Sequence, residues 1–180
     1  MNTAESIQLT LAQQAVLTTT RLVMRRPVES DIPAIVEHAN DWDVARRLGR
    51  LPHPYGLADA CFFLNEVVPN ELAWAITLCG EGTFIGAVGL TPKPESRTAE
   101  LGYWLGRRFW GQGIATEAAS AVVEYGLHSL GLAALTSGYF VDNPASGRVL
   151  AKLGFVEIGR AERPCLAEGR PLPSLDVSFH

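Results

Sequence analysis

The sequence predicts an α+β fold, a single domain built on a mixed, mostly antiparallel central sheet of about seven strands with flanking helices. Runs with strand character and runs with helical spacing follow one another, and no repeat, linker or low-complexity tract divides the chain. The 180 residues, 47% of them hydrophobic and 19% charged, are enough for one domain to bury its own core. Residues 1–19 show no clear hydrophobic period, so we expect a poorly ordered N-terminal extension there. A single domain is expected to span residues 20–180.

The charge and cysteine content narrow the class of protein. A net charge of −4 and a pI near 5.6 argue against free nucleic acid as a partner. Cys61, Cys79 and Cys165 are odd in number and lack metal-ligand spacing, so we expect reduced thiols in the cytoplasm and no metal site. The N-terminus has no basic region before its apolar residues, and no apolar run approaches about 20 residues, so neither a secretory signal nor a membrane span is predicted.

The first half of the chain contains local sequence signals for where helices and strands begin and end. Ser30 or Asp31 can cap a helix that has Pro33 in its first turn. Residues 41–55 have mixed charge and no period, which is typical of a loop. The expected elements are strands at residues 21–25, 73–78 and 84–91, and helices that begin near Asp31 and near Leu57.

The second half contains the strand that matters most for function, residues 98–105. Alternation places Ala99, Leu101, Tyr103 and Leu105 on one face, and Glu100, Gly102 and Trp104 on the other. A central helix follows and Gly131 closes it. We then expect a strand at 134–141, a helix that is capped by Asn143 and ended by Gly154, and two last strands, 155–160 and 174–179, around a proline-rich loop.

A pair of glycines separates the strand at 98–105 from the central helix. Gly111 and Gly113 allow positive φ and a close approach of the backbone, and a strand-to-helix junction collects N–H groups that bind anions. The pattern is therefore typical of a phosphate cradle. The third glycine of a dinucleotide fingerprint and the Gly-Lys-Ser/Thr of a nucleotide-binding P-loop are both absent. Two glycines before a helix are more often structural, so the pair alone is weak support for a ligand site.

A second segment, residues 142–155, reinforces this interpretation. Together, Arg108-x-x-Gly111-x-Gly113 and the downstream Asn143-x-x-Ser146 and Lys152-Leu153-Gly154-Phe155 resemble the GCN5-related N-acetyltransferase (GNAT) superfamily. The stretch from Trp110 to Ala118 is similar to the branch that acetylates ribosomal-protein N-termini. The resemblance covers about residues 20–180.

The resemblance implies acetyl-CoA as cosubstrate, without a metal. The strands at 98–105 and 134–141 should splay apart so that pantetheine pairs with the backbone of the first, while amides at 112–116 hold the pyrophosphate. The alternative for the aromatic side chains is plain core packing. The implied cofactor-binding residues are Tyr103, Trp104, Leu105, Arg108, Gly111, Gln112, Gly113, Ile114, Ala115, Thr116, Asn143 and Ser146.

Two side chains are candidates for the chemistry of acetyl transfer. Glu100 is the candidate general base, and its alternative is a surface charge paired with Arg97 or Lys93. The tyrosine that many family members carry near the leaving thiolate is replaced by Leu150, so Ser146 becomes the candidate donor. Its alternative is an ordinary helix hydroxyl bonded to backbone.

The resulting functional hypothesis is an N-acetyltransferase that moves the acetyl group directly to a primary amine, foremost a peptide or protein α-amine. A small-molecule amine acceptor and a non-catalytic acetyl-CoA-binding module stay open as alternatives. No membrane partner is expected, and the oligomeric state is a monomer or a homodimer.

Overall fold

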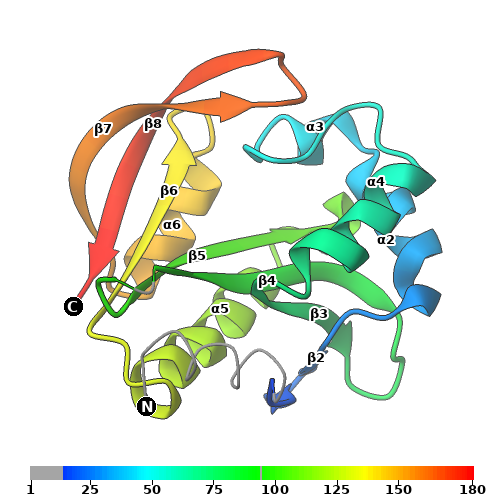
Figure 1. Ribbon diagram of the computed structural model, residues 1–180, viewed down its shortest axis with the longest axis horizontal. Coiled ribbons are helices and arrows are strands. Elements are labelled where there is room, and N and C mark those ends of the chain that lie inside the picture. The colour runs from blue at the N-terminus through cyan, green and yellow to red at the C-terminus, as the bar shows by residue number, and fades with distance from the viewer. Residues whose placement is uncertain (1–13, 94) are drawn as a thin grey trace.

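The computed structural model describes residues 14–93 and 95–180, and its centre is an eight-stranded sheet (Figure 1). The strand order is β1-β2-β3-β4-β5-β6-β8-β7, and every neighbouring pair is antiparallel except β5–β6. This confirms the predicted α+β class. The strands are β1 (Leu17–Thr18), β2 (Leu22–Arg25), β3 (Leu72–Leu78), β4 (Phe84–Lys93), β5 (Thr98–Leu105), β6 (Ala134–Phe140), β7 (Val156–Cys165) and β8 (Arg170–Phe179).

Helices cover both faces of the sheet. One face carries α5 (Ile114–Glu124), which continues as a π-helical turn at Tyr125–Ser129, and α6 (Pro144–Lys152). The other carries α2 (Ile32–Ala39), α3 (Trp42–Ala45) and α4 (Leu57–Phe62), which continues as a π-helical turn at Phe63–Val67. Two short 3-10 turns, η1 (Glu29–Asp31) and η3 (Arg107–Phe109), precede α2 and follow β5.

Two hydrophobic clusters hold these layers together. On the α5 side, Trp74, Leu90, Leu101 and Val122 belong to one large buried cluster. On the other side, a smaller cluster joins α2 and α4 to β3 and β4. At about 25 cal/mol per Å² of buried apolar area, such clusters supply the main stabilisation of the fold. Because β3 and β4 are covered on both faces, their sequences are almost continuously apolar.

The one parallel pair in the sheet is short. β5 and β6 pair only at Thr98–Ala134, Ala99–Leu135 and Glu100–Thr136, although both strands continue for several residues. β4 stays paired with β5 as far as Leu105. A gap therefore opens in the sheet on the β6 side of β5, which confirms the predicted splay of the two central strands.

Three details differ from the sequence-based expectations. The sheet has eight strands rather than about seven, because Leu17–Thr18 pairs with β2 inside the segment expected to be an extension. The prediction for residues 1–13 lies outside the described residues. Asp31 stands at the N-cap position of α2, but its carboxylate accepts hydrogen bonds from Arg25 and the Val28 N–H instead of capping that helix.

The third difference is the C-terminal hairpin. The predicted loop between residues 160 and 174 is wrong, because β7 and β8 pair along their whole lengths, including Pro164 with Pro171. Proline removes a backbone donor, which normally excludes it from a central strand. Here Pro171 and Pro173 lie beyond Ser174, the last β8 residue that pairs with β6. The hairpin reaches α3 at its tip (Figure 1), where the Leu166 N–H donates to the Gly49 carbonyl over 3.1 Å.

Two strand glycines provide a matched test of the packing between β4 and β5. A Cβ on Gly86 would lie 2.3 Å from the Trp104 carbonyl oxygen, whereas a Cβ on Gly102 would have no atom within 4 Å. We expect Gly86→Ala to lower the free energy of unfolding by about 3 kcal/mol, because backbone atoms cannot yield. Gly102→Ala should change it by less than about 1 kcal/mol. Urea unfolding followed by tryptophan fluorescence measures both, and equal effects would contradict this account.

Candidate active site

The loop after β5 presents a row of backbone N–H groups. Gly111 and Gly113 have φ of 74° and 77°, and Gly113 is the N-cap of α5. Among the described residues, no hydrogen-bond acceptor is found for the N–H groups of residues 111 to 116. The predicted cradle residues Gln112, Ile114, Ala115 and Thr116 therefore stand at the positive end of the α5 dipole with their amides unpaired by protein. This arrangement is suited to a phosphate group.

The arginines before the loop have partners on the α2–α3 side. Arg108 lies 3.2 Å from the Glu37 carboxylate and 3.4 Å from Nε2 of His38, and its guanidinium stacks on Phe109. Burial lowers the pKa of His38, and Arg108 adds to this effect against the opposing charge of Glu37. The neutral imidazole can then accept from Arg108. Arg108, predicted to contact the cofactor, is thus directed toward α2 in this structure.

The gap beside β5 exposes main-chain groups of alternate residues. The Leu101 carbonyl accepts from Ser137 Oγ on β6 at 2.8 Å, so alternation turns the N–H and C=O of Tyr103 and Leu105 to the same side. The Leu105 carbonyl accepts from the Trp110 indole at 2.8 Å. The main chain of Trp104 faces β4 instead, and its side chain packs near Phe84. Of the three predicted pantetheine contacts, Tyr103 and Leu105 present backbone to the gap.

The side chain of Tyr103 reaches α6 across the gap. Its hydroxyl lies 2.8 Å from Ser146 Oγ and 3.1 Å from the Ser146 carbonyl oxygen. Asn143 caps α6, as predicted, by accepting from the Ser146 N–H. Burial raises the pKa of Tyr103 to about 12, although its hydrogen bond to Ser146 opposes the rise. The phenol is therefore protonated at neutral pH and can donate to Ser146.

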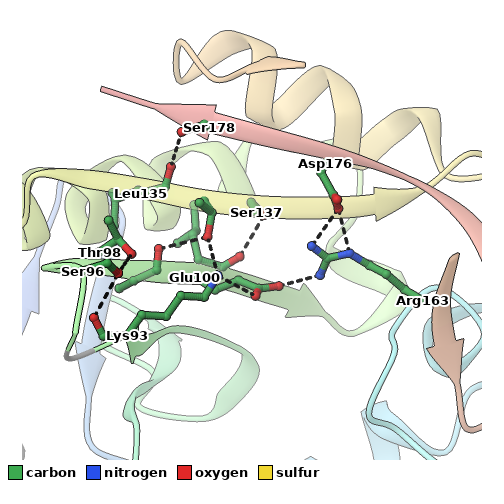
Figure 2. Close-up of polar contacts among 12 residues, drawn as sticks. Lys93, Ser96, Thr98, Glu100, Leu135, Ser137, Arg163, Asp176 and Ser178 are labelled. Carbon is green, nitrogen blue, oxygen red and sulfur yellow. Dashed lines mark hydrogen bonds and ion pairs between the residues drawn. The ribbon is translucent and has the colours of Figure 1, made fainter. Parts of the chain in front are cut away.

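Glu100 lies on the opposite face of the sheet, where it is part of an ion-pair network (Figure 2). Its Oε1 accepts from Arg163 on β7 at 2.6 Å, and Lys93 lies 3.8 Å from Oε2. Arg163 also contacts Asp176 on β8 at 2.9 Å, so its guanidinium lies between two carboxylates. The Glu100 side chain is one-third exposed, so water reaches its carboxylate.

The structure thus brings together residues that the sequence keeps apart. Tyr103, Asn143 and Ser146 meet on the α6 side of the gap, while Glu100 stands on the α2 side. The alternative partner Lys93 is present beside Glu100, whereas Arg97 donates to the Gly131 carbonyl instead. Arg163 and the Tyr103 side chain were not identified from sequence. No local motif marks Arg163, since it is 63 residues from Glu100.

Comparison with known proteins identifies the class to which this site belongs. Residues 21–156 match the family described as acetyltransferase (GNAT) domain. A relative from Bacillus subtilis strain 168, named uncharacterized N-acetyltransferase YoaA, is 30% identical over 162 residues, covering 87% of this chain and 91% of the relative. The chain belongs to the GNAT family of acetyltransferases. It is accordingly an N-acetyltransferase, an acyltransferase that transfers an acetyl group to a nitrogen atom.

Other similarities are more partial. The ribosomal-protein-serine acetyltransferase of Escherichia coli strain K12 is 35% identical over 77 residues, which covers 42% of this chain and 43% of that protein. An acetyltransferase structure from Bacillus anthracis has a TM-score of 0.82 at 21% identity, with coverage of 92% and 98%. The spermidine N-acetyltransferase of Vibrio cholerae, in complex with CoA and spermine, has a TM-score of 0.77 at 19% identity, with coverage of 89% and 96%. The two structures show the same fold.

Two features are absent from the part of the chain that the structure describes. No group of three or more His, Cys, Asp or Glu side chains could hold a metal ion. None of the described helices is long and apolar enough to cross a membrane.

Proposed function

We propose that this protein transfers the acetyl group of acetyl-CoA directly to a primary amine, and that its acceptor is the α-amine of a peptide or protein. One observation carries the proposal. The gap at β5–β6, which exposes the main chain of Tyr103, lies on the strand that leads into the row of unpaired amides at residues 111–116. A linear ligand with a peptide-like arm and a diphosphate matches these two features.

The chain's own groups have separate tasks in holding the donor. The main-chain N–H and C=O of Tyr103 can pair with the amides of pantetheine, as a neighbouring strand would. The amides of residues 112–116 can donate to the diphosphate, which the dipole of α5 also favours. Arg108 can add positive charge only if it leaves Glu37 and His38. The bound donor supplies the thioester whose acetyl group is transferred.

In the proposed reaction, the amine and the thiolate are handled on opposite faces of the sheet. A new C–N bond forms as the amine attacks the thioester carbonyl, and the C–S bond breaks to release the thiolate. Glu100 lies on the α2 side and Ser146 on the α6 side, so the amine approaches from the face of Glu100 and the thiolate leaves toward Ser146. Residues 41–55 and the tip of the β7–β8 hairpin, which are in contact, border the acceptor side.

Ser146 can hydrogen-bond the departing thiolate. When Tyr103 donates to Ser146 Oγ, the proton of the serine hydroxyl is free to donate to sulfur. The phenol in this position compensates for the leucine at 150, which is buried in the core. A partly buried tyrosine with a raised pKa keeps its proton and can sustain this orientation at neutral pH.

Glu100 can take a proton from the amine nitrogen, directly or through water, as the neutral amine attacks the thioester. Arg163 donates to Oε1 of Glu100 and competes with this role. An α-amine has a reference pKa near 7.7–8.0, against about 10.4 for lysine, so much more of it is already neutral near pH 7. A modest base therefore suffices for an α-amine.

Two observations favour the α-amine over a polyamine. The chain is partly similar to the ribosomal-protein-serine acetyltransferase of Escherichia coli, with 35% identity over 77 residues. In addition, four carboxylates on the acceptor side are already paired with arginines: Glu100 and Asp176 with Arg163, and Asp43 and Asp142 with Arg46. A polycation would require several carboxylates without such partners.

A small-molecule amine is the second candidate acceptor, because a protein of the same fold is named a spermidine N-acetyltransferase. A module that binds acetyl-CoA without turnover is the third possibility. Leu150 in place of the tyrosine favours such a module, whereas the Tyr103–Ser146 pair argues against it.

We further propose a cytoplasmic protein, monomeric or homodimeric, without a nucleic-acid or membrane partner. Its three cysteines, Cys61, Cys79 and Cys165, are all unpaired.

The first functional prediction concerns the leaving group. Ser146→Ala should lower kcat about 100-fold with little change in acetyl-CoA affinity, because its bond to sulfur strengthens only in the transition state. Tyr103→Phe should lower kcat by roughly fivefold, since it removes one hydrogen bond to the serine. Thiol release and acetyl-CoA titration measure the two quantities. A Ser146→Ala enzyme with wild-type kcat would show that Ser146 only caps and packs.

The second prediction concerns the base. Glu100→Gln should remove the acidic limb of the pH profile of kcat, because the amide has no proton to lose in that range. Asp176→Asn is the matched control, since it removes the other carboxylate from Arg163 and should leave that limb in place. If both variants keep the wild-type profile, Glu100 serves only as an ion-pair partner of Arg163.

The third prediction tests the acceptor. Two versions of one peptide are compared, one with a free N-terminus and blocked lysines, the other with a blocked N-terminus and free lysines. We expect the kcat/KM for the first to exceed that for the second by more than tenfold near pH 7, as follows from the two amine pKa values. A preference for the lysine peptide, or activity only on polyamines or amino sugars, would refute the α-amine but not the acetyltransferase.

A further inference from the structure

An arginine from the first strands is bonded to the loop that forms the cradle. Arg21, just before β2, donates from Nη1 to the Gln112 carbonyl oxygen at 3.0 Å. Its Nε and Nη2 each lie 2.7 Å from Oε2 of Glu117, one turn into α5. The guanidinium thus spans from the helix to the loop.

Glu117 is itself held in place from the strand side. Its Oε1 accepts from the Thr19 hydroxyl at 2.5 Å and from the Arg21 backbone N–H at 3.0 Å. Partial burial would raise the pKa of Glu117, but the hydrogen bonds from Thr19 and Arg21 outweigh it and lower that pKa below its usual value. Glu117 is therefore ionised at neutral pH and anchors Arg21.

The bond to the Gln112 carbonyl controls the direction of a neighbouring N–H. In a trans peptide, the C=O of Gln112 and the N–H of Gly113 lie in one plane and point to opposite sides. Gly113 has φ of 77°, and a glycine offers little resistance to rotation of the peptide plane before it. Arg21 draws the carbonyl to its own side and so turns the Gly113 N–H to the other.

We propose that Arg21 is a positioning residue for the diphosphate-binding loop and that Glu117 and Thr19 hold it in that role. The inference rests on the proposed use of acetyl-CoA. Its effect runs through the orientation of the backbone, because the charge of the guanidinium is matched by Glu117. An open groove of about 560 Å³, lined in part by Thr19, Gly113, Thr116 and Glu117, lies beside this network.

The alternative is that these contacts only fasten the first strands to α5. The two roles differ in their dependence on the ligand. A positioning role weakens ligands that carry the diphosphate and spares those that lack it, whereas a general loss of structure weakens both. Coenzyme A and S-acetylpantetheine form such a pair, since both occupy the β5–β6 gap and only coenzyme A reaches the loop.

The experiment measures the affinities of both ligands for four proteins. Titration calorimetry serves for coenzyme A, and NMR shift titration serves for the weaker S-acetylpantetheine. We expect Arg21→Ala to weaken coenzyme A about tenfold and to leave S-acetylpantetheine unchanged. Glu117→Gln should act in the same direction with a smaller effect. Arg160→Ala is the control, because Arg160 is an exposed arginine on β7 whose partner Glu157 lies 3.9 Å away.

A second readout examines the loop directly. The amide NMR signal of Gly113 should shift in unliganded Arg21→Ala and return toward its wild-type position in Arg21→Lys, which can still donate to the Gln112 carbonyl. Failure of the wild-type protein to bind coenzyme A would overturn the proposed function. Normal binding of coenzyme A by Arg21→Ala, or an equal loss of both ligands, would overturn the positioning role alone.

Discussion

The end of hydrogen bonding between β5 and β6 is the constraint on which the rest of the structure depends. Two parallel strands that part after Glu100 and Thr136 leave main-chain groups facing a gap inside a sheet. Such groups are costly unless they are satisfied, and the chain satisfies some of them with side chains from Ser137 and Trp110. The main chain of Tyr103 is left to pair with a ligand.

The gap between the parted strands also connects the two faces of the sheet. On one face, α6 and β5 bring a serine and a tyrosine hydroxyl into contact. On the other, three strands contribute Glu100, Arg163 and Asp176 to one network. In the proposed reaction, the amine approaches from the face of Glu100 and the thiolate leaves toward Ser146, so both sets of side chains are used. An unbroken sheet would keep the two sets of side chains apart.

The turn between β1 and β2 is bonded to α5 and to the loop before it. Arg21 and Thr19 contact Glu117 across more than 90 residues of sequence. In isolation, an acidic residue in the first turn of a helix is explained by the helix dipole alone. Its bonds to Thr19 and Arg21, in the turn between β1 and β2, give this residue defined partners and link the edge of the sheet to the loop. This link is the basis of the positioning role that we propose for Arg21.

The sequence by itself determined the order and type of most elements, the glycine turn at Gly111 and Gly113 before α5 and the family resemblance, because these depend on local periodicity, capping and spacing. It could not determine the long C-terminal hairpin, since prolines are acceptable there only where β8 extends past the end of β6. Nor could it assign Glu100 to Arg163, Tyr103 to Ser146 or Glu117 to Arg21. Tertiary structure decided these pairs, because side chains tens of residues apart meet only when strand register and helix packing bring them together.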